Sequence, residues 1–142
     1  MNTRIIAAAL GAAALVLPAA AVADPGHGHK PKKAKTVTFV FKGTFTAPGT
    51  VSVLSGNAHV RKGGYVGQSI SFDLATAKIV AVDTNADQKV DLGDVADGDK
   101  VLVQARVTKG TKYAAPAEGE TAAAIAARKL IDQTRLSTED AE

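Results

Sequence analysis

The residues of this chain with the clearest chemical potential lie in segment 83–94, which reads Asp-Thr-Asn-Ala-Asp-Gln-Lys-Val-Asp-Leu-Gly-Asp. Side chains that carry oxygen occupy its positions 1, 3, 5, 9 and 12, while position 7 offers a backbone carbonyl. Ca²⁺ takes roughly six to eight oxygen ligands, and these positions have the ligand order of a calcium loop. The segment therefore predicts a Ca²⁺ site whose ligands come from Asp83, Asn85, Asp87, Lys89, Asp91 and Asp94.

This pattern resembles the EF-hand-type calcium loop of the dockerin modules of bacterial cellulosomes, which also use Asp at position 12. The resemblance implies that the five oxygen-bearing side chains and the Lys89 carbonyl are ligands. It covers only these twelve residues. Dockerins have two such loops, each followed by a helix, whereas this chain has one, followed by Val-Ala-Asp-Gly-Asp and a predicted strand. Binding of the dockerin's cohesin partner is therefore not implied.

Three positions of the loop affect how well it should work. Gln88 stands at position 6, where such loops have glycine, and a left-handed non-glycine residue costs roughly 1 kcal/mol. Asp94 has a shorter reach than the usual glutamate, so we expect weak affinity, about 10⁻⁴–10⁻³ M. Val90 at position 8 is expected to turn inward and anchor the loop on the core. The alternative is an acidic turn that binds nothing, because Asp and Asn are common turn residues.

The first 23 residues have the pattern of an export signal. Arg4 is followed by an apolar run over 5–17 and by the small residues Ala-Val-Ala at 21–23. Cleavage there would leave 119 of the 142 residues, enough for one modest domain. The apolar run is too short for a permanent span, and no second one follows. We therefore expect a secreted or otherwise extracytoplasmic protein with no stable membrane span after cleavage. The absence of Cys excludes a lipid-anchored cysteine and disulfides.

Charge is distributed unevenly along the chain. The formal net charge is +3, and loss of Arg4 would leave 16 basic against 14 acidic side chains. Segment 24–35 holds four lysines and predicts a disordered basic linker, whereas segment 83–99 holds six aspartates. We expect residues 135–142 to form a flexible acidic tail. The basic linker could contact an anionic cell-envelope polymer, although the partner remains unknown from the sequence.

Residues 36–134 are predicted to form one small antiparallel β-barrel domain. Six strand-like runs separated by turn signals cover 36–45, 50–54, 58–62, 68–74, 78–82 and 101–107. Segment 122–134 is rich in alanine, but its large apolar residues share no helical face, so we favour a strand over 125–132. The run 94–103 is similar to the late turn and strand of OB-like barrels in exported bacterial domains of unknown function. The resemblance implies a fold and no activity.

An enzyme is not indicated, because the predicted domain lacks a nucleophile motif, a phosphate-binding loop and a cysteine. His59, the one histidine of this domain, is expected on a strand.

We expect a non-enzymatic binding or structural module with one calcium loop. The alternative is an OB-type binder of a cell-envelope polysaccharide or other polyanion, using Arg61, Lys62, Tyr65 and the basic linker. A nucleic-acid partner is not expected, because aromatic residues are few and an export signal is present.

Overall fold

The computed structural model describes residues 31–136 of the chain. The predicted export signal (1–23), most of the basic linker (24–30) and the end of the tail (137–142) lie outside the described residues, so these three expectations stay predictions. Residues 31–35, the described part of the linker, are exposed and belong to no helix or strand. The described residues from Lys33 onward belong to one compact unit.

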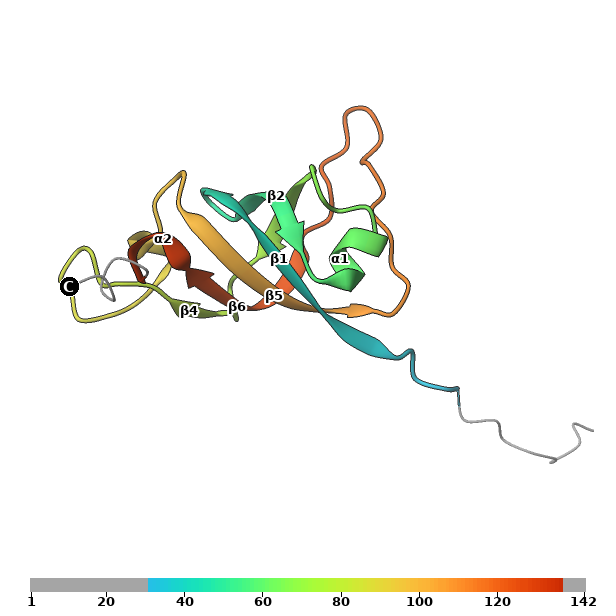
Figure 1. Cartoon of the computed structure of the whole chain (residues 1–142), viewed down its shortest axis with the longest axis horizontal. Helices are drawn as coiled ribbons and strands as arrows, with labels where there is room; N and C mark the ends of the chain where they lie inside the picture. Colours follow the sequence, from blue (N-terminus) through green and yellow to red (C-terminus); the bar gives the residue numbers. More distant parts are fainter. Residues whose placement is uncertain (1–30, 137–142) are drawn as a thin grey trace, which may run out of the picture. The chain divides into compact units, whose positions relative to one another are not determined.

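The described residues are mostly β-structure with few helices, as predicted (Figure 1). The six strands are β1 (Thr36–Thr46), β2 (Thr50–Gly56), β3 (Ser69–Asp73), β4 (Lys78–Val80), β5 (Lys100–Thr108) and β6 (Ile125–Asp132). The helical turns are α1 (Ala58–Lys62), the 3₁₀ turn η1 (Leu92–Asp94) and α2 (Gln133–Leu136). The strand favoured over 125–132 is therefore confirmed, with the expected bounds.

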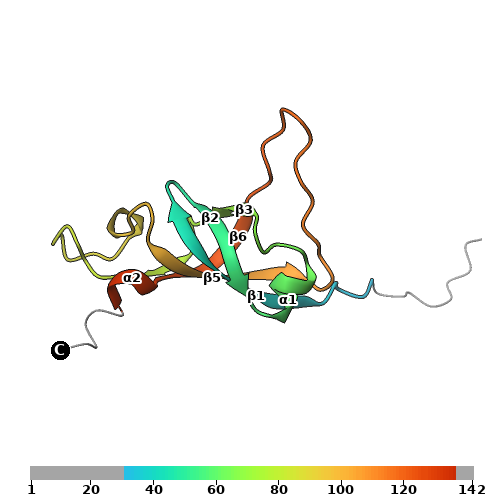
Figure 2. The ribbon, with the colours of Figure 1, turned by 45° about the horizontal axis from the view of Figure 1, so that its top comes forward.

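Five of the strands form a ring, which Figure 2 shows from a second side. The sheet order is β3-β2-β1-β5-β6, and β6 then pairs in parallel with β3 through Phe72 and Ile125. β4 lies outside the ring, parallel to β6 and on the side of β6 away from β5. β4 leads directly into the acidic loop, so its pairing with β6 fixes where that loop begins.

β1, an 11-residue strand, pairs with β2 on one side and with β5 on the other. Its buried positions alternate, as expected for a strand with one face on the core, and Phe39, Phe41 and Phe45 face the interior. The register with β2 shifts after Lys42, and a Cβ atom on Gly43 would overlap the Ser52 carbonyl oxygen. Only glycine allows the two strands to approach this closely. The core contains Phe39, Phe41, Phe45, Val51, Val53, Val60, Tyr65, Ile70, Phe72, Val95, Val101, Val103, Ala105, Ala127 and Leu130.

The strand predicted over 58–62 is wrong, because these residues form helix α1. Asn57 caps the helix, since its side-chain oxygen accepts a hydrogen bond from Val60 N at 3.2 Å. The amide nitrogen of the same side chain donates to the Thr38 carbonyl of β1 at 2.9 Å. The helix then buries Val60 completely. These contacts with a distant strand override the extended preference of the local sequence.

The alternative polyanion binder requires Tyr65 on the surface beside Arg61 and Lys62, and this expectation is also wrong. Only 4% of Tyr65 is exposed, and its ring meets Phe41 edge to face with 5.5 Å between centroids. Phe39 and Tyr113 contact the same ring at 5.7 and 5.9 Å. Burial raises the pKa of the Tyr65 hydroxyl, because the phenolate would lose its hydration. Tyr65 therefore belongs to the core, and it does not form a surface cluster with Arg61 and Lys62.

The expected tail begins later than residue 135. Residues 133–136 form α2, and Thr134 Oγ1 accepts a hydrogen bond from Lys100 N at 2.6 Å. Thr134 N donates to Asp132 Oδ1 at 2.8 Å, so this turn is attached to the end of β6 and to the start of β5. Arg135, expected in the tail, instead contacts the region that follows the acidic loop.

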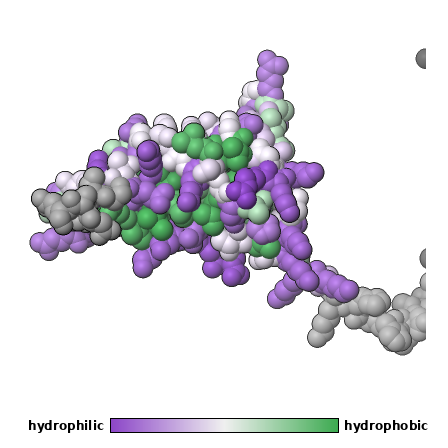
Figure 3. Space-filling view, in the orientation of Figure 1, coloured by the Kyte–Doolittle hydropathy of each residue, from purple (hydrophilic) through white to green (hydrophobic). Residues whose placement is uncertain are grey.

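The surface of this unit is mixed. On the face in view, hydrophobic patches are separated by hydrophilic side chains (Figure 3). The connection between β5 and β6 projects from the ring in both ribbon views and has a hydrophilic tip. In the stretch 31–136, no helix is long and apolar enough to cross a membrane.

Candidate metal site

The acidic loop 83–94 connects β4 with β5 and lies at one end of the strand ring, opposite α1 (Figures 1 and 2). Its last three residues form η1. Most of the loop is exposed, while Asp94 is 1% exposed. The loop is therefore a surface segment whose end is anchored in the protein.

Asp83, at position 1, organises the first half of the loop. Its Oδ1 accepts a hydrogen bond from Ala86 N at 2.7 Å, and its Oδ2 accepts one from Gln88 N at 2.9 Å. One carboxylate thus holds the backbone at positions 4 and 6. Ala86 and Gln88 both adopt left-handed conformations, with φ of 58° and 66°. The prediction that Gln88 must take the strained conformation usually left to glycine is confirmed.

Three further predicted ligands make local turns of the Asx kind. Asn85 Oδ1 accepts from Asp87 N at 2.9 Å, and Asp87 Oδ1 accepts from Lys89 N at 2.8 Å. Asp91 Oδ1 accepts from Gly93 N at 2.7 Å and caps η1. Each of these side chains therefore turns toward the loop's own backbone.

Asp94, at position 12, connects the two ends of the loop. Its Oδ1 accepts hydrogen bonds from Thr84 N at 2.8 Å and from the Thr84 hydroxyl at 3.1 Å. Its Oδ2 accepts from Asp91 N at 3.1 Å, which completes a capping box at η1. The hydrogen bond from Thr84 N, followed by that from Asp91 N, holds the pKa of Asp94 below its usual range, although burial opposes this. Asp94 is therefore kept as a carboxylate inside the protein.

The predicted ligands share one loop, but the structure does not gather their acidic groups into a cluster. Within residues 31–136, no group of three or more His, Cys, Asp or Glu side chains lies close enough together to hold a metal ion. The donors themselves suit a hard cation, because all of them are oxygens. A carboxylate or amide oxygen that accepts one N–H bond keeps a second lone pair, so most of these side chains can still bind a cation. Asp94 Oδ1 is the exception, because it accepts two hydrogen bonds, which leaves Oδ2 as the available oxygen of Asp94.

Val90 does not anchor the loop, so the prediction for position 8 is wrong. Its side chain is 45% exposed. Leu92, two residues later, is half-buried and packs against the core, and Val95 is buried in it. The capping of η1 by Asp91 turns the chain at this point, and the inward-facing apolar position moves from 8 to 10.

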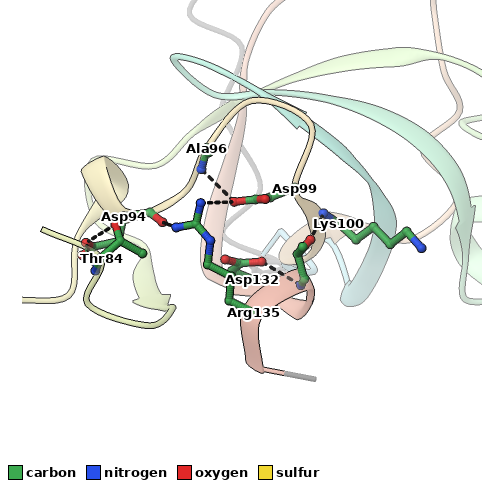
Figure 4. A network of polar contacts seen from close by, with 8 residues as sticks. Thr84, Asp94, Ala96, Asp99, Lys100, Asp132 and Arg135 are labelled. Atoms are coloured by element: carbon green, nitrogen blue, oxygen red, sulfur yellow. Dashed lines mark hydrogen bonds and ion pairs between the residues drawn. The ribbon is translucent and has the colours of Figure 1, made fainter. Parts of the chain in front are cut away.

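Arg135 contributes to the region around the loop, and sequence analysis did not assign it a role (Figure 4). Its Nη1 donates to the Asp94 carbonyl oxygen at 3.1 Å. Its Nη2 lies 3.8 Å from Asp99 Oδ2, and that oxygen also accepts from Ala96 N at 2.8 Å. Because Arg135 is 41 positions from Asp94 in the chain, no local pattern could have revealed this contact.

His59 was expected on a strand but lies in α1. It is half-buried, and its ring stacks on that of Phe39 with 5.7 Å between the ring centroids.

In comparisons with protein families, curated proteins and solved structures, nothing matches this chain. The site must therefore be interpreted from its own geometry.

Proposed function

We propose that the chain is a secreted, non-enzymatic binding or structural module that carries one Ca²⁺-binding loop, residues 83–94. The observation that carries this proposal is the double hydrogen bonding of Asp83 to positions 4 and 6 of the loop. It curls the backbone in the way that a loop with ligands at alternate positions requires. The hydrogen bond that Thr84 N, at position 2, donates to the Asp94 carboxylate, at position 12, brings the two ends of the loop together and supports the same interpretation.

In this proposal the ion is held by side-chain oxygens of Asp83, Asn85, Asp87, Asp91 and Asp94 and by the Lys89 carbonyl. The negative charge of four aspartates on twelve residues disfavours the loop without a cation, and Ca²⁺ would remove that repulsion. Loop ordering and ion binding are thereby coupled, so Ca²⁺ should stabilise the folded protein. Left-handed Gln88 and the short Asp94 side chain favour weak binding, about 10⁻⁴–10⁻³ M.

The domain that carries the loop is proposed to be an OB-like barrel. The ring order of β1, β2, β3, β6 and β5, closed by the parallel pairing of β3 with β6, supports this proposal. In an OB-fold, five strands form a partly open barrel of this kind. Export rests on the sequence of residues 1–23. The alternative polyanion binder, as formulated with Tyr65, loses support because Tyr65 is buried.

The proposal is tested by thermal unfolding with and without about 10 mM Ca²⁺, a concentration roughly tenfold or more above the expected dissociation constant. Saturation at ten times this constant stabilises by about 1.4 kcal/mol, which raises the melting temperature by roughly 5 °C or more. Asp87→Ala should abolish the shift. Asp73→Ala is the matched control, because Asp73 also accepts a backbone N–H two residues ahead, from Ala75 at 3.0 Å, but outside the loop.

The proposal is wrong if neither the melting temperature nor the NMR signals of residues 83–94 respond to Ca²⁺. It is also wrong if Asp87→Ala and Asp73→Ala respond equally. A parallel titration with Mg²⁺ distinguishes a Ca²⁺ site from a general effect of divalent cations, because Mg²⁺ demands a tighter octahedral arrangement.

A further inference from the structure

A second candidate site lies at the opposite end of the strand ring from the acidic loop, beside α1 (Figures 1 and 2). It is a hollow of about 260 Å³ between the end of α1 and the turn 109–112 that follows β5. Its lining includes His59, Lys62, Lys109 and Lys112. We call this hollow the lysine pocket.

The two walls of the lysine pocket are distant in sequence but held together by backbone hydrogen bonds. Tyr113 N donates to the Gly63 carbonyl at 2.8 Å, which joins the turn to the end of α1. Lys109 N donates to the Lys35 carbonyl at 2.8 Å, which joins the turn to the start of β1. Within the turn, Thr111 donates to the Thr108 carbonyl through both its N–H and its hydroxyl. The backbone of the pocket is therefore fixed before any ligand binds.

Among residues 31–136, no carboxylate balances the charge of the lysine pocket. All three lysines are exposed, and no described Asp or Glu lines the pocket. The sequence also contains no acidic residue over 36–72 or 100–117, the segments that build this end of the protein. Three like charges around one hollow create a local positive potential that attracts an anion.

We propose that the lysine pocket binds a phosphate group. A pocket of about 260 Å³ is smaller than the roughly 300–1,000 Å³ typical of drug-sized ligands, so it suits a single ionic group with its immediate substituent. Lysine ammonium groups act on phosphate as point charges, and a phosphate monoester carries about −1.5 to −2 charge at pH 7. A carboxylate, with one charge, would match three lysines less well. The half-buried His59 also lines the pocket and offers a further polar group.

The test is an NMR titration of the full mature chain with inorganic phosphate at fixed ionic strength, without Ca²⁺. We expect shift changes confined to residues 59–63 and 109–112. The double variant Lys62→Gln/Lys112→Gln should weaken binding about tenfold. Lys78→Gln, which removes an exposed lysine at the start of β4, should change it less than twofold. Because these lysines are exposed, the variants should remain folded, and their amide spectra check this directly.

The proposal is overturned if phosphate changes the NMR shifts of surface lysines throughout the protein and not mainly those of the pocket. It is equally overturned if the double variant binds phosphate as tightly as the wild-type protein. It is also overturned if acetate produces the same shift changes at the same concentration.

Two further titrations identify the source of the phosphate. Tighter binding of poly(glycerol phosphate) than of glycerol phosphate, at equal phosphate concentration, supports a polymer ligand, and equal binding supports a small molecule. Neither result depends on the acidic loop, so failure here leaves the Ca²⁺ proposal untouched.

Discussion

Replacing Gln88 by glycine is expected to tighten Ca²⁺ binding by the acidic loop. Gln88 N donates to Asp83 Oδ2 at 2.9 Å, and this hydrogen bond requires the left-handed backbone, with φ of 66°, that the structure shows. A glutamine pays a steric penalty in that conformation because its Cβ approaches the following carbonyl oxygen. Glycine has no Cβ, so this steric penalty is absent. The loop should therefore close around an ion more readily in the Gln88→Gly variant.

The size of the effect follows from two opposing contributions. Removing the left-handed penalty gains roughly 1–2 kcal/mol. The greater backbone freedom of glycine in the open loop costs roughly 0.5–1 kcal/mol. At the midpoints of these two ranges the net gain is about 0.75 kcal/mol, which corresponds to a dissociation constant about three- to fourfold lower.

Isothermal titration calorimetry with Ca²⁺ measures this change, and thermal unfolding in the presence of Ca²⁺ provides an independent measurement. Gln88→Ala is the matched control, because it removes the same side chain beyond Cβ but keeps the left-handed penalty. It should bind Ca²⁺ as the wild-type protein does. The reasoning is refuted if Gln88→Gly leaves the affinity unchanged or weakens it, or if Gln88→Ala gains as much as Gln88→Gly does.

Three further predictions concern the fold. Phe41→Ala should lower the free energy of unfolding by about 3–5 kcal/mol in urea titrations, because Phe41 is fully buried and contacts Phe72 at 5.0 Å; a loss below 1 kcal/mol would contradict its core position. Gly43→Ala should also destabilise, because its Cβ would overlap the Ser52 carbonyl oxygen across the β1–β2 pair; an unchanged midpoint in the same titration would contradict this close approach. Burial raises the pKa of Tyr65 above the unfolded value of 10.0, so the folded state retains this proton longer. The resulting contribution to stability is complete below pH 10 and is lost as the pH rises through the folded-state pKa; Tyr65→Phe should flatten this alkaline decline in melting temperature, and an unchanged decline would contradict the assignment.

Much of the β-structure could be predicted from the sequence because alternation is a local property of a strand. The apolar residues of β1 and β5 recur at every second position, and all three of Phe39, Phe41 and Phe45 are buried. A helix over 122–134 was disfavoured by the same kind of argument, and β6 occupies Ile125–Asp132. The turns that separate these strands, such as the one at 47–49, contain proline and glycine, whose conformational limits are also local.

The candidate Ca²⁺ site was found from the spacing of oxygen-bearing side chains within one loop. The structure adds how the loop is held, with Asp83 on positions 4 and 6 and Asp94 buried at its end. It also moves the apolar anchor from Val90 to Leu92. That correction could not be predicted from the spacing, because it depends on how η1 packs against the rest of the ring.

The alternation of the strands, their turns and the composition of the acidic loop can all be read from the sequence, since each depends on residues close together in the chain. The helix at 58–62 depends instead on a tertiary contact, because Asn57 donates a hydrogen bond to the Thr38 carbonyl of β1. The burial of Tyr65 and the contact of Arg135 with Asp94 also depend on the packing of distant segments. The lysine pocket likewise exists because the fold brings 59–63 beside 109–112. Such contacts join residues far apart in sequence, and no local pattern encodes them.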